Sequence, residues 1–293
     1  MLQVIISPAK QMRVMRDSFA PRGIPPFPEQ TGRLFRELRR IERSEGAEGL
    51  RKLWKVNDAL LAQNIELLDR FECVRDEADL DDPAIAALVS PAAFSYVGIQ
   101  YRSLAPEVLD LDALTWMQDH LWILSGFYGC ARPFDAIEPY RLEMGARIAV
   151  DGARDLYAFW GDSIARRIDS SEPAPNDSSD SFEPGLDESS ASETASGTVV
   201  INLASAEYAK AVLPHLSSSA QVVTCVFGEE LRDGKPVQRA TASKIARGSM
   251  VRWMAERACM DAAELTAFDV GYHFAPEFSE QGERVSKLVF LRA

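Results

Sequence analysis

The sequence predicts one compact domain that combines β-strands with α-helices, and three observations lead to this prediction. The chain has 293 residues, 46% of them hydrophobic, so it is long enough to bury one large core. Short apolar runs typical of buried strands occur together with longer segments of helical periodicity. Both patterns are found on either side of a polar segment at residues 169–197, so the two parts of the chain are expected to share that core.

The individual elements follow from local patterns. Residues 2–6 are a continuous apolar run ended by Ser-Pro, which predicts a buried strand. Residues 30–44 place their apolar side chains on one helical face, and Gly46 is expected to end that helix. Two further helices are predicted at residues 48–55 and 58–71. The same patterns predict the remaining elements, with strands at residues 121–124, 199–203, 222–227, 237–240 and 288–291 and helices at residues 156–168, 206–213 and 243–258.

The segment at residues 169–197 is rich in Ser, Asp, Glu and Pro, and it contains eight acidic residues without a Lys or Arg. It cannot bury enough apolar surface to offset the entropy of ordering it, which predicts a disordered acidic insertion within the domain. The formal net charge of the chain is −12, but without these eight acids 36 acidic residues face 32 basic ones. Local clusters of Lys and Arg therefore decide which ligands the body of the protein attracts.

Compartment and cofactors are constrained mainly by what the sequence lacks. The first apolar run is too short for a secretion signal or a membrane span, so we expect a cytoplasmic protein with no membrane partner. Its four cysteines and three histidines are scattered without metal-ligand spacing, so we expect free thiols, no metal site and no cofactor. No catalytic motif such as GxSxG or HExxH occurs, and the sequence leaves open whether the protein is an enzyme.

The most informative segment is LSGFYGCARPFDAIEPYRLE at residues 124–143. Its glycines and prolines fix a backbone path that is neither a regular helix nor a regular strand. Arg132 and Arg141 each offer a planar set of five donors that fits phosphate or carboxylate, and Tyr140 adds a ring with a polar tip. The segment is typical of an anion-binding surface. The alternative is a structural crossover in which Arg141 pairs with Glu143.

Polar residues also follow two of the predicted strands. Lys10 comes shortly after the first strand, at the end where open sheets commonly bind ligands, and Ser7 adds a hydroxyl. The alternative is a solvated lysine after a turn. Asn202 and Ser205 lie where a later strand meets a helix that carries Lys210, and the free amides of a helix start favour an anion. Ser205 is also a candidate N-cap, whereas capping does not explain Asn202.

An acid-free run at residues 235–252 contains five Lys and Arg residues. Lys244 and Arg247 are three residues apart, hence on one face of the predicted helix, and Gly248 permits close approach of another backbone. A surface helix would normally mix both signs of charge. The run therefore favours a role facing an anion.

Seven segments together resemble the YaaA family of peroxide stress resistance proteins, and they span nearly the whole chain in family order: ISPAK, LWKVNDALLAQN, GIQYRSL, LSGFYGCARPFDAIEPYRLEMG, LYAFWGD, VINLASAEYAK and KIARGSMVRW. The resemblance implies a single-domain α+β fold over residues 1–293. In this fold a mixed β-sheet is surrounded by helices, with a basic cleft and a helix-hairpin-helix-like element.

The resemblance also implies a cytosolic peroxide-stress protein that binds DNA and helps limit iron-dependent oxidative damage by keeping unincorporated iron low. The hairpin element would be residues 50–68, although its turn at residues 55–58 lacks the glycines usual in such elements. The residues that the resemblance places in the cleft are Lys10, Arg132, Arg141, Asn202, Lys210, Lys244 and Arg247. Our predicted anion-binding set adds Ser7, Tyr140 and Ser205 to them.

Two functions remain open at this point. The first is DNA binding through phosphate contacts, with DNA as the partner. The second is an enzyme that acts on a nucleotide or on modified or damaged nucleic acid in the same cleft, with Tyr140, Glu143, Asn202 and Asp162 as its polar groups and a nucleotide-like small molecule as the partner. Direct sequestration of iron is a third, less supported function, because the chain lacks clustered His and Cys.

Overall fold

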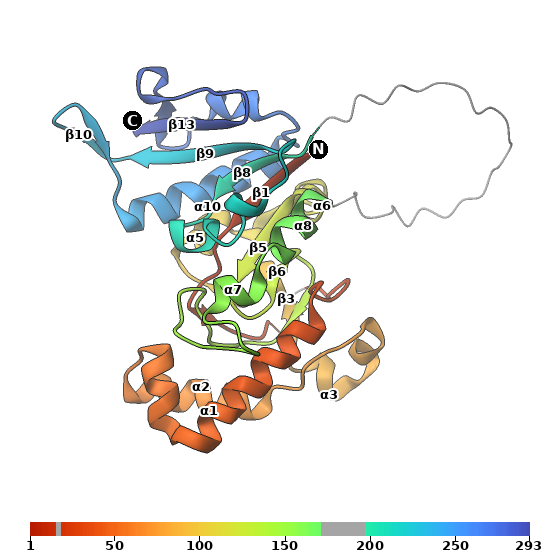
Figure 1. The fold of residues 1–293 in the computed structure, drawn as a ribbon. Coiled ribbons are helices and arrows are strands. Elements are labelled where there is room, and N and C mark those ends of the chain that lie inside the picture. The colour runs from red at the N-terminus through yellow and green to blue at the C-terminus, as the bar shows by residue number, and fades with distance from the viewer. Residues whose placement is uncertain (16–18, 171–196) are drawn as a thin grey trace, which may run out of the picture.

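The computed structural model describes residues 1–15, 19–170 and 197–293. In this part of the chain a seven-stranded sheet forms the centre of the domain, and helices pack around it (Figure 1). In spatial order the strands are β12 (Tyr272–Phe274), β13 (Val285–Arg292), β9 (Gln221–Gly228), β8 (Val199–Leu203), β1 (Leu2–Ile6), β5 (Leu121–Ser125) and β6 (Gly129–Ala131).

The inner strands, from β13 to β5, run parallel, whereas the short edge strands β12 and β6 are antiparallel to their neighbours. The sheet is therefore mixed and lies in a single domain, as expected. Its parallel core makes the fold α/β rather than α+β, because parallel neighbours need crossover connections, which here contain helices. All of β1 is buried, in agreement with its continuous apolar run.

The strand order reverses at β1. The chain first adds β5 on one side of β1 and then adds β8, β9 and β13 in turn on the other side. The parallel register pairs Ile6 with Leu203, so β1 and β8 end at the same level of the sheet. Open α/β sheets commonly bind ligands beyond the carboxyl ends of their strands at such a reversal.

Helices α1 (Pro28–Trp54) and α2 (Asp58–Arg70) contact each other and form a layer away from the sheet (Figure 1). The predicted break at Gly46 is present, with φ 64° and ψ −165°, and the two helices predicted on either side of it are the halves of α1. Asn57 caps α2 through its side chain, which accepts a hydrogen bond from the Leu60 N–H at 3.0 Å.

Three other helices pack together beside the sheet. Helix α6 (Leu111–His120) contacts β1 and β5, α10 (Ala240–Glu256) contacts β9, and α5 (Ile99–Leu104) packs on α10. The α5–α10 contact depends on Gly248, since a Cβ at this position would lie 2.0 Å from the Gln100 carbonyl oxygen. This confirms that Gly248 permits close approach of a second backbone.

Shorter elements complete the described part of the chain. Three small antiparallel pairs form between β2 (Gln11–Met12) and β4 (Tyr96–Val97), β3 (Ser90–Pro91) and β7 (Ala136–Ile137), and β10 (Glu230–Arg232) and β11 (Lys235–Val237). The short helices are α3 (Pro83–Ala86), α4 (Ala92–Ser95), α7 (Leu156–Trp160), α8 (Ser163–Asp169), α9 (Ala206–Ala209), η1 (Glu77–Asp81), η2 (Pro106–Val108), η3 (Leu213–His215), η4 (Ala262–Ala267) and η5 (Pro276–Phe278). No helix within the described ranges combines the length and apolar character needed to cross a membrane.

Three predicted elements differ from the structure. The helix predicted at residues 156–168 is divided into α7 and α8 by Gly161, whose φ of 50° favours glycine. The helix predicted at residues 206–213 ends after one turn, at the end of α9. The strand predicted at residues 237–240 is wrong, because β11 ends at Val237 and α10 begins at Ala240. A four-residue window does not separate the end of a strand from the start of a helix.

The acidic insertion predicted at residues 169–197 lies mostly outside the described residues. The described residues on its two sides meet, because Thr198 Oγ1 donates a hydrogen bond to the Asp169 carbonyl oxygen at 3.0 Å. The end of α8 and the residue before β8 therefore lie side by side.

Candidate functional site

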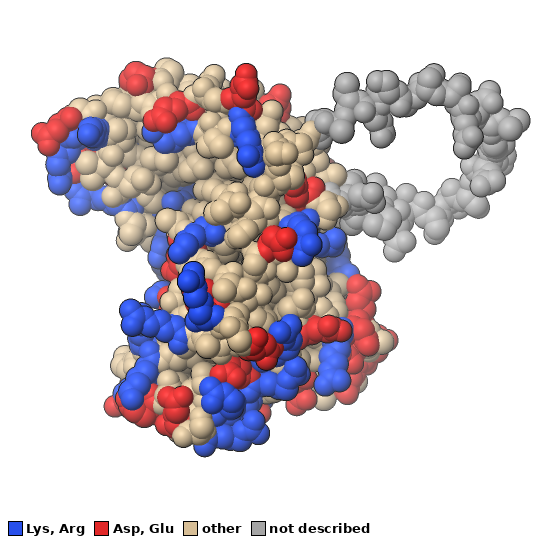
Figure 2. All heavy atoms as spheres, in the orientation of Figure 1, with Lys and Arg blue, Asp and Glu red and all other residues tan. Residues whose placement is uncertain are grey.

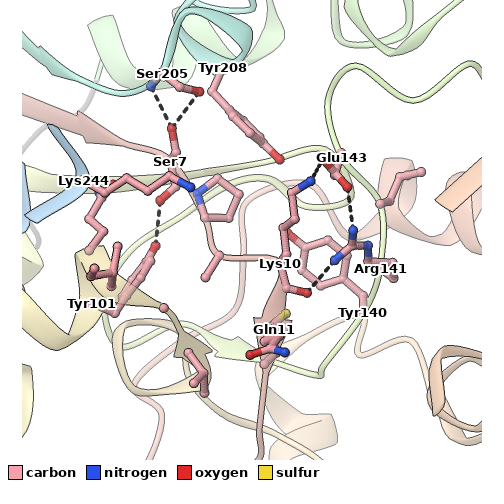
Figure 3. Close-up of a pocket in the computed structure, with 18 of the residues that line it drawn as sticks. Ser7, Lys10, Gln11, Tyr101, Tyr140, Arg141, Glu143, Ser205, Tyr208 and Lys244 are labelled. Atoms are coloured by element: carbon pink, nitrogen blue, oxygen red, sulfur yellow. Dashed lines mark hydrogen bonds and ion pairs between the residues drawn. The ribbon is translucent and has the colours of Figure 1, made fainter. Parts of the chain in front are cut away.

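A cavity of about 870 Å³ opens beyond the carboxyl ends of β1 and β8, where the strand order reverses. We call it the central cavity (Figure 3). Its lining comes from segments far apart in sequence: residues 7–12, one face of α2, residues 97–101 at the start of α5, residues 140–143, the start of α9 and the middle of α10. Cavities of roughly 300–1,000 Å³ are typical of small-molecule and cofactor sites.

Ser7 and Ser205 join the ends of β1 and β8 at this cavity (Figure 3). The Ser205 backbone N–H donates to Ser7 Oγ at 2.8 Å, and the Ser7 hydroxyl donates to Ser205 Oγ at 3.2 Å. The Tyr101 hydroxyl donates to the Ser7 carbonyl oxygen at 3.0 Å. Ser205 occupies the N-cap position of α9, as predicted, but its side chain makes no capping hydrogen bond to the helix. These contacts fix the backbone that carries Lys10 into the site.

Glu143 is shared by two cations that line the central cavity. Lys10 Nζ lies 2.8 Å from Glu143 Oε2, and Arg141 Nη2 donates to Glu143 Oε1 at 2.7 Å. Arg141 Nη1 also donates to the Lys10 carbonyl oxygen at 2.9 Å. The Arg141–Glu143 pair expected for a structural crossover is thus present, and both partners also line the cavity. One carboxylate serves two cations, so this cluster keeps one positive charge in excess.

Lys244 and Arg247 line the cavity from one face of α10, whereas the other three cations of the acid-free run do not line it. Arg239 and Arg252 pair with glutamates outside the cavity. Among the described residues, neither Lys244 nor Arg247 has a carboxylate within salt-bridge distance, and Arg247 Nε is buried without a hydrogen-bond partner. Burial lowers the pKa of Arg247. A half-buried charge without a counter-ion is costly, and a bound anion would offset that cost.

Tyr140 connects the cavity to the buried turn that follows β5. Its hydroxyl lies 2.6 Å from Ser125 Oγ and 3.1 Å from the Tyr96 hydroxyl. Ser125 Oγ also accepts hydrogen bonds from the backbone N–H groups of Phe127 and Tyr128, at 3.1 and 2.8 Å. Burial raises the pKa of Tyr140, so its hydroxyl is protonated at neutral pH and is a hydrogen-bond donor.

The structure brings together most of the residues predicted to form an anion site. Those that line the central cavity are Ser7, Lys10, Tyr140, Arg141, Ser205, Lys244 and Arg247. The predicted residues that do not line it are Arg132, Asn202 and Lys210.

Arg132 lies at the opposite end of the sheet from the cavity. Its guanidinium stacks over Trp122, 3.7 Å from the ring centroid. It donates to Gln3 Oε1 at 3.2 Å and to the Leu121 carbonyl oxygen at 3.3 Å, near the amino ends of β1 and β5. Burial lowers the pKa of Arg132 to about 10. Contrary to the prediction, Arg132 supports the sheet and does not face the cavity.

Asn202 and Lys210 also have structural partners. Asn202 is buried, its Oδ1 accepts from the Ala204 N–H at 3.0 Å, and its Nδ2 donates to Thr224 Oγ1 at 3.3 Å. The Lys210 ammonium lies 4.4 Å from the centroid of the Tyr157 ring. The Asn202 amide thus fixes the end of β8, and Lys210 packs on an aromatic ring outside the cavity.

Several cavity residues were not predicted from the sequence. Gln100 is 7% exposed and its Nε2 has no hydrogen-bond partner, while Tyr101 contacts Ser7. The Tyr208 side chain points toward Lys10 and Glu143 (Figure 3). The GIQYRSL segment contributes to the family resemblance, but no local pattern in it distinguishes a cavity glutamine from a core residue.

Charge is unevenly distributed over the surface. On the face shown in Figure 2, Lys and Arg side chains are most numerous over the lower layer, and a few lie at the waist between this layer and the sheet. Acidic side chains are prominent at the side of the lower layer and along the upper edge. Separate basic regions therefore exist on a protein whose formal net charge is −12.

The cysteines do not form part of the cavity lining. All four are free thiols, as predicted, and all but the half-buried Cys73 are buried. Burial raises the pKa of each thiol, so none of them favours the reactive thiolate. In the part of the chain that the structure describes, no group of three or more His, Cys, Asp or Glu side chains is arranged to hold a metal ion.

Comparison with known proteins adds a family context to this geometry. A family model described as "Peroxide stress protein YaaA" matches residues 2–278. A UPF0246 protein of Desulfitobacterium hafniense is 35% identical over 293 residues, which are 100% of this chain and 98% of the relative. A UPF0246 protein of Lactiplantibacillus plantarum is 36% identical over 290 residues, 99% of each chain. The matched range includes every segment that lines the central cavity.

Proposed function

Because the chain belongs to the peroxide stress protein YaaA family, we propose that it acts in the response to hydrogen peroxide by binding DNA at the central cavity. The observation that carries this proposal is the pair Lys244 and Arg247, two cations on one helical face that lack acidic partners among the described residues. DNA offers phosphate at every nucleotide. In this proposal Lys10, Arg141 and this pair form a basic cleft.

The α1–α2 hairpin is proposed as the second DNA contact, in the manner of a helix-hairpin-helix-like element at residues 50–68. Leu60, Gln63 and Leu67 on α2 line the cavity, so the hairpin adjoins the proposed phosphate site. Its turn has no glycine, but Lys55 has φ 52° and ψ 51°, the left-handed conformation that glycine favours. The turn therefore has the tight geometry usual for glycine, and Lys55 is exposed on it.

Protection from iron-dependent damage follows from the same contacts in this proposal. DNA phosphates hold a layer of condensed cations, which a protein releases when its Lys and Arg residues neutralise those phosphates. Ferrous iron held in that layer would be released with the other cations. Binding would thus remove iron from the DNA on which peroxide would otherwise generate damaging radicals.

The test is the salt dependence of binding to a fluorescently labelled duplex, measured by anisotropy. Two removed phosphate contacts should reduce the slope of log affinity against log salt by about 1.8. The test variant is the double substitution Lys244→Ala and Arg247→Ala. A matched control is Arg239→Ala with Arg252→Ala, which removes two cations of the same run that pair with glutamates elsewhere. Equal effects of the two variants, or no binding at low salt, would contradict the proposal.

Protection itself is measured by nicking of supercoiled plasmid in ferrous iron and hydrogen peroxide. The wild-type protein is expected to slow nicking at concentrations that saturate the plasmid. The Lys244→Ala and Arg247→Ala double variant is expected to protect less at the same concentration. Protection that does not follow DNA occupancy would separate the two parts of the proposal.

A second function, an enzyme acting on a nucleotide or on damaged nucleic acid, is favoured by the volume of the cavity and by the buried Tyr140 hydroxyl beside it. Glu143 also lines the cavity, whereas Asn202 and Asp162 do not, and Asp162 pairs with Arg166 at 2.9 Å. Incubation with nucleotides and with damaged duplexes, followed by product analysis, tests this function. Turnover that is lost in Tyr140→Phe would support it.

A further inference from the structure

The charged side chains that line the central cavity do not balance. The cations are Lys10, Arg141, Lys244 and Arg247, and the acids are Glu143 and Glu207. The lining therefore carries two more positive charges than negative ones. This excess lies on a protein with 44 acidic and 32 basic residues, so it runs against the overall composition.

The charge of Glu207 offsets the one positive charge that Lys10 and Arg141 keep beyond Glu143, so the net excess of two equals the two cations of α10. Glu143 is held by Lys10 and Arg141, and Glu207 Oε1 accepts a hydrogen bond from the Gly145 N–H at 2.8 Å. Lys244 and Arg247 are left without a carboxylate among the described residues. Side chains three residues apart on a helix have Cβ atoms about 5–6 Å from each other, which allows both cationic groups to reach one tetrahedral anion.

We propose that this pair binds the phosphate monoester of a nucleotide, either a free nucleoside monophosphate or the phosphorylated end of a DNA strand. A monoester carries about −1.5 to −2 charges at pH 7, which matches the excess, whereas an internal phosphodiester carries about one. The inference rests on the proposed function, because it specifies which phosphate the same cavity prefers.

The rest of the cavity suits the nucleoside part of such a ligand. Tyr101, Tyr140 and Tyr208 supply aromatic surface and protonated hydroxyl groups, since burial raises the pKa of each. Gln100 lines the same space with an amide nitrogen that has no hydrogen-bond partner. A glutamine amide both donates and accepts, as the edge of a base requires.

The first experiment measures charge preference by isothermal titration calorimetry. Each of the four deoxynucleoside 5′-monophosphates is titrated into the full chain, and so is the 5′-methyl ester of each, which carries one charge fewer on the same nucleoside. At least one monophosphate is expected to bind 10-fold or more tightly than its methyl ester. The second experiment distinguishes a free nucleotide from a strand end as the source of the monoester. It compares the affinity for duplexes with 5′-phosphate ends and for duplexes with 5′-hydroxyl ends.

The variant Lys244→Gln tests the assignment to α10. In this variant the affinity for a monophosphate is expected to be close to the affinity for its methyl ester, so that their ratio is near one. Its matched control, Arg252→Gln on the same helix, removes a cation that pairs with Glu256 and should leave the ratio unchanged. Thermal unfolding of both variants confirms that each is folded.

The outcomes separate this inference from the proposed function. Equal affinity for monophosphates and methyl esters, together with equal affinity for the two duplex ends, would overturn the inference. If salt-dependent binding of the 5′-hydroxyl duplex persisted, the proposed function would survive that result. A monoester preference that disappears in Lys244→Gln, with free nucleotides or at strand ends, supports the inference.

Discussion

Arg247 and Arg141 line the same cavity, but their surroundings are opposite. Arg141 is 10% exposed and pairs with Glu143, whereas Arg247 has no carboxylate partner among the described residues. Removing a guanidinium from water costs free energy, which a partner offsets for Arg141 and a ligand would offset for Arg247. The position of Arg247 is therefore better explained by binding than by stability.

This contrast gives the first prediction. Replacing Arg247→Met should raise the free energy of unfolding by about 0.5–2 kcal/mol, because a desolvated charge is exchanged for an apolar side chain of similar length. DNA binding should weaken in the same variant. Urea denaturation measures the first effect, and Arg141→Met is the control, expected to destabilise because Glu143 loses a partner. A destabilised Arg247→Met protein would show that the guanidinium has a stabilising partner.

The second prediction concerns Ser125, which is fully buried beside the cavity. Ser125→Ala leaves the Phe127 and Tyr128 N–H groups without their acceptor, at a cost of about 1–3 kcal/mol in unfolding free energy. Tyr140→Phe removes a hydroxyl from the same network without orphaning a backbone group, so it should cost less. Denaturant unfolding of both variants compares them, and a larger loss in Tyr140→Phe would contradict the account.

At this scale, the sequence identified cationic side chains that could bind an anion, but it did not show which of them already have a partner in the folded protein. The spacing of Lys244 and Arg247 is a local property of one helix, so it was readable. The prediction that Arg132 and Asn202 belong to the site did not anticipate their partners, Trp122 and Thr224, because these lie on neighbouring strands. Whether a polar side chain is already satisfied depends on tertiary contacts, which the sequence does not display.

At the scale of elements, the turn between α1 and α2 shows how a strained position persists. Lys55 adopts a left-handed conformation that costs an L-residue roughly 1–2 kcal/mol, and its N–H donates to the Arg51 carbonyl oxygen at 2.8 Å. The turn is then followed by the Asn57 cap of α2. The hydrogen bond of the Lys55 N–H and the Asn57 cap help to offset the conformational strain at Lys55.

The third prediction follows from that turn. Lys55→Gly should raise the free energy of unfolding by about 0.5–1 kcal/mol, the relief of left-handed strain less the extra entropy of glycine in the unfolded chain. Lys55→Ala removes the same charge without relieving the strain, so the difference between the two variants isolates the backbone effect. Chemical denaturation provides the measurement. Equal stabilities of the two variants would show that the strain is absent.

Elements with strong local signals were predicted, and those set by context were not. The apolar runs of β1, β8 and β9 correspond to buried strands of the sheet. The edge strands β6 and β12 have three residues each, too few for a periodic pattern to emerge. Both Gly46 and Gly161 interrupt a helix with a positive φ, but the sequence predicted only the break at Gly46.

At the scale of the whole molecule, the strand order creates the site. The reversal at β1 brings the ends of β1 and β8 together, and α2, α5 and α10 close the space above them. Strand pairing between residues 2–6 and 199–203 is not encoded in any local pattern. The sequence therefore identified strand-end residues such as Ser7 and Ser205 but not their contact with each other.

The fourth prediction concerns the pH dependence of global stability. Burial raises the pKa of Asp135 and of Glu138 to about 7. Both groups ionise near pH 4 when unfolded, so between pH about 4 and about 7 the folded state binds more protons than the unfolded state. Their contribution to the free energy of unfolding is present below this window and is lost as pH rises through it.

The double variant Asp135→Asn with Glu138→Gln removes both titrations while retaining acceptors for the Arg132 and Glu72 N–H groups. Its unfolding free energy should depend less on pH across this window than that of the wild type. Urea unfolding at several pH values measures the two slopes. Identical slopes would show that neither carboxyl group titrates with a raised pKa.

The hydrogen bond from Thr198 to the Asp169 carbonyl oxygen has a practical consequence for protein engineering. Two described positions that are hydrogen-bonded to each other can be joined through an inserted domain without being pulled apart. A fluorescent module spliced between Ser170 and Gly197 is therefore expected to leave the host domain intact, and it would provide a reporter of where the protein travels in a living cell.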